Sequence, residues 1–217
     1  MKIQINLVVI LLSLVLVGCK TTAPVPMPKT SFKPAENLSN EKVLVVFEDN
    51  FAKHLHNESQ LMMIFQYDLG QYLSYAIKDS LDSSYATVDI GSTTADKSNY
   101  DIVITPRLVR FEAPVPIQVY LRTKSEIEIE YTVNTKAPLK PFIIQGFGDY
   151  EIDSDEEEKI YDSLSVSGPD IYYYDVSTGI GMNIPNYAYV AGRDSAIAVR
   201  QSLVSLLSQL KKKLKNT

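Results

Sequence analysis

Side chains that carry most enzyme chemistry are scarce in this 217-residue sequence, which contains one cysteine, two histidines and no tryptophan. A single thiol cannot form a disulfide within the chain or complete a cysteine-ligated metal site, so the fold must rely on its core. A hydrolytic triad needs a base, and only His54 and His56 are candidates. No Gly-x-Ser-x-Gly segment is present to hold a nucleophile. These absences predict a protein that is not an enzyme.

The two histidines do not make a metal site by themselves. In an extended segment, His54 and His56 lie on the same side, where two ring nitrogens can meet one ion. A site requires three or four ligands, and the sequence offers neither a second histidine pair nor a free thiol to complete it. The acidic residues between Asp149 and Glu158 are contiguous, which suits a solvated loop better than two carboxylates held apart across a cleft. We predict no metal and no cofactor.

Basic residues are also few. The chain has 21 Lys and Arg against 26 Asp and Glu, a formal charge of -5. Only the C-terminal end, with Lys211, Lys212, Lys213 and Lys215, is locally basic, so the electrostatic footprint of a nucleic-acid-binding protein is missing. A hydrophobic content of 45% and a charged content of 22% are typical of a globular domain with a sizeable core. We predict no nucleic-acid partner.

The N-terminal apolar run is too short for a transmembrane helix. A spanning helix needs about 20 predominantly apolar residues, whereas residues 3–17 are fewer and include Gln4, Asn6 and Ser13. The run follows Lys2 and ends at the small residue Gly18, which is the pattern of an export signal over residues 1–18. Its removal takes away Lys2 and leaves a formal charge of -6.

The sequence Leu16-Val17-Gly18-Cys19 resembles a bacterial lipobox. The resemblance implies that the chain is cut between Gly18 and Cys19 and that Cys19 carries a diacylglycerol and acyl chains such as palmitate. Two or more acyl chains make membrane attachment stable where one is marginal. An ordinary signal peptide with an incidental cysteine is the alternative.

The residue after the cysteine bears on location. Lipoproteins with Asp at that place are typically held at the inner membrane, and this chain has Lys20. The resemblance therefore favours the inner leaflet of the outer membrane, facing the periplasm, with the periplasmic face of the inner membrane as the alternative. Residues 19–40 contain four prolines and no apolar periodicity, which predicts a tether with a reach on the order of 60 Å.

Residues 41–217 predict one α+β domain, with a mostly antiparallel sheet and two main amphipathic helices packed on one face. Apolar spacing predicts one helix over 61–81. It predicts a second helix that is capped by Asp194 or Ser195 and carries an apolar stripe of Ile197, Val204, Leu207, Leu210 and Leu214. Gly146-Phe147-Gly148 indicates a turn or a bulge. The expected strands are 43–47, central and buried on both faces, then 87–90, 100–111 with an interruption at Pro106, 117–121, 126–133 and 142–152.

This order of elements resembles a group of envelope lipoproteins that includes auxiliary lipoproteins of ABC-type transport systems, the lipopolysaccharide-assembly lipoprotein and relatives of the curli-secretion lipoprotein. The resemblance implies a non-catalytic subunit of an envelope complex. Residues 153–189 have no counterpart in this order of elements. They are predicted to form an acidic and tyrosine-rich insertion. Candidate partner contacts are the glutamate row of one strand and the tyrosines of the insertion, namely Glu126, Glu128, Glu130, Tyr172, Tyr173 and Tyr174.

Two other interpretations remain open. The tyrosines can equally close the core under a long loop, because tyrosine combines an apolar body with a polar tip. The domain can also hold a lipid or another apolar ligand between helix and sheet, in which case Met62, Met63 and Phe65 line a pocket instead of filling the core.

Overall fold

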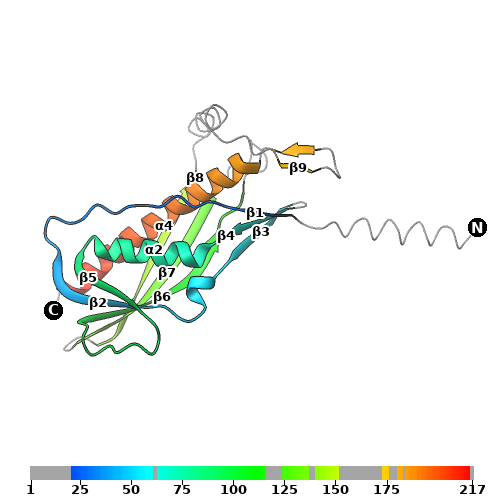
Figure 1. The fold of residues 1–217 in the computed structure, drawn as a ribbon. Coiled ribbons are helices and arrows are strands. Elements are labelled where there is room, and N and C mark those ends of the chain that lie inside the picture. The colour runs from blue at the N-terminus through cyan, green and yellow to red at the C-terminus, as the bar shows by residue number, and fades with distance from the viewer. Residues whose placement is uncertain are drawn as a thin grey trace, which may run out of the picture.

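The computed structural model describes residues 21–60, 63–115, 124–136, 140–151, 173–175, 180–182 and 184–215. The predicted α+β class is confirmed: two long helices pack against one face of a five-stranded sheet, beside a smaller three-stranded sheet and a short hairpin (Figure 1). The elements are β1 Thr21–Pro24, β2 Ser39–Val46, η1 Phe51–Lys53, β3 His56–Gln60, β4 Met63–Tyr67, α2 Leu69–Asp82, β5 Tyr85–Gly91, β6 Ile102–Glu112, β7 Lys124–Thr135, β8 Phe142–Glu151, β9 Tyr173–Asp175, β10 Ile180–Met182 and α4 Ile184–Lys215.

The large sheet has the order β5-β2-β6-β7-β8, parallel across its first three strands and antiparallel across its last three. As predicted, β2 is buried on both faces. Val43 and Val45 are fully buried on the helix side. Leu44 and Val46 are buried on the opposite side, where Tyr100 packs over them.

The alternation predicted for residues 126–133 is confirmed in β7. Ile127, Ile129, Tyr131 and Val133 are all 0% exposed and face the helices. The neighbouring strand β6 runs through Pro106 without a break. Proline is tolerated there because β2 pairs with β6 only as far as Ile104, so no ladder partner requires the missing N–H.

Helix α4 lies directly on β8 because two glycines remove the side chains between them. A Cβ at Gly148 would sit 1.9 Å from the carbonyl oxygen of Ala198, and one at Gly146 would sit 2.4 Å from that of Ser202. Gly146-Phe147-Gly148 is therefore the middle of a strand and not a turn, which corrects the sequence prediction. Glycine at these positions allows the backbones of β8 and α4 to approach each other closely.

The C-terminal helix begins ten residues earlier than its expected cap. Asp194 lies inside α4, where it is 1% exposed and accepts hydrogen bonds from Arg193. The predicted stripe is confirmed at Leu207 and Leu210, which are buried, but not at Val204, which is 47% exposed. Leu203 and Leu206 are buried beside them.

The first predicted helix is wrong over its first part. Residues Met63–Tyr67 form strand β4, and α2 begins at Leu69. Met63, Phe65 and Tyr67 are buried in alternation, which is the period of a strand. Apolar side chains of this strand also continue the apolar stripe of the helix that follows. The sequence pattern therefore does not separate the strand from the helix.

The expected tether is folded against the domain over the part that the structure describes, residues 21–40. Strand β1 pairs in parallel with β4, and Val25 is 5% exposed in the core. Residues 25–38, which we call the strap, then contact both helices on the way to β2 (Figure 1): Pro26 meets α4 at Gly192, and Tyr72 of α2 donates a hydrogen bond to the carbonyl of Pro28. Prolines lack an N–H, so this extended segment leaves few backbone donors unpaired.

None of the helices in the described part of the chain combines the length and the apolar composition needed to cross a membrane.

Replacement of Gly148 by Ala should lower the free energy of unfolding by about 2 kcal/mol, because the new methyl group meets a helix carbonyl that cannot move freely. Gly91→Ala is the matched control, since its Cβ would meet only side-chain atoms of Ala95 and Leu44. Urea unfolding of both variants measures the difference. An equal effect of the two substitutions would contradict the proposed packing of α4 on β8.

Candidate docking surface

The face of the five-stranded sheet opposite α2 and α4, called here the outer face, carries the predicted glutamate row. Over β5, β2 and the start of β6 this face is closed by Ala95 and Tyr100. Over β6, β7 and β8 it presents charged and apolar side chains. The register places Arg107 opposite Glu130 and Arg110 opposite Glu128, so bases of β6 meet acids of β7.

Glu130 is held by its neighbours on both sides. Its Oε1 lies 3.2 Å from Nη2 of Arg107, and its Oε2 accepts a hydrogen bond of 3.0 Å from Nε2 of Gln145. The residue is 8% exposed. The hydrogen bonds from Arg107 and Gln145 hold the pKa of the Glu130 carboxyl below its usual value. This side chain therefore stabilises the sheet and offers a partner little free surface.

Glu126 belongs to a network of ion pairs. Its two oxygens lie 2.8 Å from Arg110 and 2.9 Å from Lys124. Lys124 also reaches Asp149 on β8 at 2.7 Å, and Arg110 reaches Glu112 at 2.9 Å. The hydrogen bond from Arg110 holds the pKa of Glu112 below its usual value. Cross-strand pairs of this kind contribute roughly 0.2–1 kcal/mol each.

Glu128 differs from the other two glutamates. Its side chain is half-buried, and within the described residues it forms no hydrogen bond or ion pair, because Arg110 reaches Glu126 and Glu112 instead. On β8 its register partner is Phe147, which is 49% exposed, and Ile143 on the same face is 59% exposed. We call Glu128, Ile143 and Phe147 the docking patch.

The charge of the outer face is negative overall. Across β6, β7 and β8, six acidic and three basic side chains share it, a formal excess of three negative charges. They are Glu112, Glu126, Glu128, Glu130, Asp149 and Glu151 against Arg107, Arg110 and Lys124. This charge and the exposed aromatic ring suit a partner that presents a cation beside an apolar side chain.

The free edge of β8 is closed by side chains of α4. Gln209 donates a hydrogen bond of 2.6 Å to the carbonyl of Gln145, and Gln201 accepts one of 3.2 Å from the N–H of Asp149. Ser202 adds a bond of 2.8 Å to the carbonyl of Gly146. Side chains that occupy polar groups of an edge make it less available for pairing with another strand.

The other predicted contacts lie elsewhere. Tyr173 and Tyr174 belong to strand β9, which pairs with β10 in a separate hairpin just before α4. Tyr172 lies outside the described residues, as do Gly18 and Cys19. The structure therefore does not bring the tyrosines into the sheet that carries Glu126, Glu128 and Glu130. Phe147 and Ile143 were missed by sequence reasoning, although their spacing of four in a strand places them on one face.

The two histidines have different surroundings. His56 pairs with Glu58 at 2.9 Å and packs edge-on against Phe111. His54 lines an open hollow of about 220 Å³ beside Glu48. In the ranges that the structure describes, no three side chains of His, Cys, Asp or Glu gather as metal ligands.

The residues expected to line an apolar pocket are in the core. Met63 is 6% exposed and Phe65 is 2% exposed, and both belong to the main cluster of buried side chains. Met62 lies outside the described residues. Ligand carriage stays a prediction, and it has no cavity at these two positions to support it.

No protein-family model and no curated protein matches this chain. Among solved structures, protein XCC0632 of Xanthomonas campestris, assigned to the DUF330 family, is similar over 91% of this chain and 99% of its own, at 10% identity and a TM-score of 0.48. The PelC dodecamer of Paraburkholderia phytofirmans in space group P6 is similar over 80% of this chain and 94% of its own, at 14% identity and a TM-score of 0.36. These structural neighbours are weak.

The hydrogen bonds of Glu130 predict a pH dependence of stability. Because its folded pKa is depressed, the stabilisation is present above the ordinary glutamate pKa of about 4.3 and is lost as the pH falls through the folded value. Below about pH 4.3, the free energy of unfolding of Glu130→Gln should therefore fall less steeply with pH than that of the wild type. Glu128→Gln, which removes the same charge without breaking such bonds, is the control for the loss of one negative charge in chemical denaturation. Identical slopes for all three proteins would contradict the assignment.

Proposed function

We propose that this protein is a lipid-anchored, non-catalytic accessory subunit of a bacterial envelope assembly that serves transport, secretion or the cell wall. The observation that carries the proposal is the docking patch, where the carboxylate of Glu128 forms no hydrogen bond or ion pair within the described residues and lies beside an exposed phenylalanine. Exposed apolar side chains next to ordered charges are typical of protein interaction sites.

The anchor is proposed from the sequence before the domain. Leu16-Val17-Gly18-Cys19 resembles a lipobox and follows a segment with the pattern of an export signal. The proposed location is the inner leaflet of the outer membrane, with the domain in the periplasm, and the periplasmic face of the inner membrane is the alternative. The order of elements resembles the auxiliary envelope lipoproteins and supports a role within a larger complex.

The docking patch defines the chemistry of the proposed partner. A lysine or arginine of the partner can pair with Glu128, while an apolar side chain next to it covers Phe147. The neighbouring ion pairs of Glu126 and Glu130 hold the surrounding side chains in place, so little conformational entropy is lost when the partner binds. A surface of this kind needs no catalytic group.

Cys19→Ala should move the protein from the membrane fraction to the periplasmic fraction of a two-membrane host, because it removes the acyl chains that make attachment stable. Ser13→Ala, inside the export signal, is the control that should leave attachment unchanged. Labelled palmitate should enter the Ser13→Ala protein and the wild type but not the Cys19→Ala protein. Membrane attachment of Cys19→Ala equal to wild type would contradict the lipid anchor.

A photo-crosslinking residue placed at Phe147 should capture one envelope protein in cells. The same residue at Ile90, which is 51% exposed on the opposite edge strand, serves as the control. Glu128→Lys should lower the yield of the Phe147 adduct by at least about tenfold, equivalent to about 1.4 kcal/mol, because it replaces an attraction to the partner's cation by a repulsion.

Glu112→Lys is the matched charge reversal, since Glu112 is exposed and already paired with Arg110. It should lower the adduct yield much less than Glu128→Lys. Adducts of equal yield at Phe147 and Ile90, or an adduct that survives Glu128→Lys unchanged, would show that the docking patch is not the contact. Co-purification of lipid without any protein adduct would favour the ligand carrier instead.

A further inference from the structure

The folded domain begins almost at the residue that carries the proposed anchor. Strand β1 starts at Thr21, two residues after Cys19. Two fully extended residues span at most about 7 Å. In the parallel ladder between β1 and β4, Thr21 is aligned with Met63, and Met63 is in turn aligned with Gln60 of β3. The proposed lipid attachment point is therefore about 7 Å or less from the end of the three-stranded sheet.

This end of the chain is fixed to the domain by contacts along its length. Ala23 and Val25 are each 5% exposed in the core, and the N–H of Val25 donates a hydrogen bond of 2.8 Å to the carbonyl of Gln66. Further along the strap, the N–H of Phe32 donates to Oδ2 of Asp79 at 3.1 Å. Release of β1 as a flexible tether would remove two apolar side chains from the core, so the strand does not extend freely.

The composition of this end also suits a lipid surface. At this end of the three-stranded sheet, the two outermost rows of aligned residues carry no charge. Their residues are Thr21, Thr22, Ser59, Gln60, Met63 and Ile64. Elsewhere charge is common, since 22% of the chain is charged and its overall charge is negative. An anionic lipid surface repels acidic groups, and none of these six residues is acidic.

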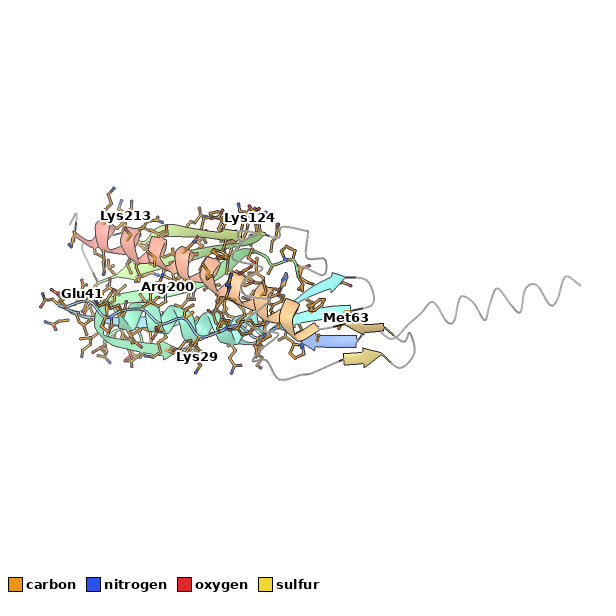
Figure 2. All side chains as sticks on the ribbon, turned by 90° about the horizontal axis from the view of Figure 1, so that it is seen from above. Lys29, Glu41, Met63, Lys124, Arg200 and Lys213 are labelled. Atoms are coloured by element: carbon orange, nitrogen blue, oxygen red, sulfur yellow. The ribbon has the colours of Figure 1, made fainter. Side chains whose placement is uncertain are left out.

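We infer that this end of the three-stranded sheet rests on the membrane and that the strap holds the domain against the lipid surface. The inference depends on the lipidation of Cys19 that we propose above. Figure 2 shows Met63 at one end of the molecule and Glu41 and Lys213 at the other. The lysine-rich end of α4 then faces away from the lipid.

The test uses the full lipidated chain in vesicles of phosphatidylethanolamine and phosphatidylglycerol that contain a headgroup-attached nitroxide quencher. Lipidation consumes the single natural thiol, so one added cysteine takes a fluorophore uniquely. Ser59→Cys reports on the sheet end and Lys213→Cys on the opposite end. Quenching at position 59 should exceed quenching at position 213 several-fold.

A control chain carries about ten Gly and Ser residues between Lys20 and Thr21, which add a mean reach on the order of 18 Å. The insertion should abolish most of the difference between the two positions. Equal, weak quenching at both positions in the uninserted chain would overturn the inference while leaving the anchor intact. A wild-type chain that neither carries lipid nor floats with the vesicles would overturn the proposed anchor, and the inference with it.

Discussion

The rest of the structure depends on the close contact between helix α4 and strand β8. Gly146 and Gly148 let the helix backbone approach the strand so closely that a methyl group would meet the carbonyls of Ser202 and Ala198. The contact covers one face of the sheet, and Gln201 and Gln209 of the same helix occupy polar groups of the free edge. In the part of the sheet that the structure describes, the outer face of β6, β7 and β8 is covered by neither helix.

On that face, most charges are used within the domain. Glu126 and Glu130 are held by bases on neighbouring strands, and their ion pairs fix the surface around Glu128. An ordered charged surface loses little entropy in binding, and within the described residues the Glu128 carboxylate beside Phe147 forms no hydrogen bond or ion pair, which suits it to the contact that we propose. The same cross-strand packing that stabilises the sheet therefore also orders the side chains of its outer face.

Elements were predicted correctly where the pattern of apolar residues fits only one type of secondary structure. The alternation of residues 127–133 and the β-branched run of β2 each fit one structure, and both predictions are confirmed. The prediction failed at residues 63–67, where strand and helix periods coincide, and in the strap, where Val25 lies between prolines but is buried in the core. Among the three glutamates of β7, only Glu128 forms no hydrogen bond or ion pair within the described residues, and this difference depends on cross-strand register, which no local pattern reveals.

The most direct measurement is carboxyl footprinting with a water-soluble carbodiimide, comparing the purified lipoprotein with native envelopes. If the outer face docks a partner, labelling of Glu128 should fall several-fold in envelopes, while Glu41, which is exposed at the opposite end of the molecule from Met63, should change little (Figure 2). Equal labelling of Glu128 in both preparations would contradict the central claim, because its carboxylate would then be free in the cell.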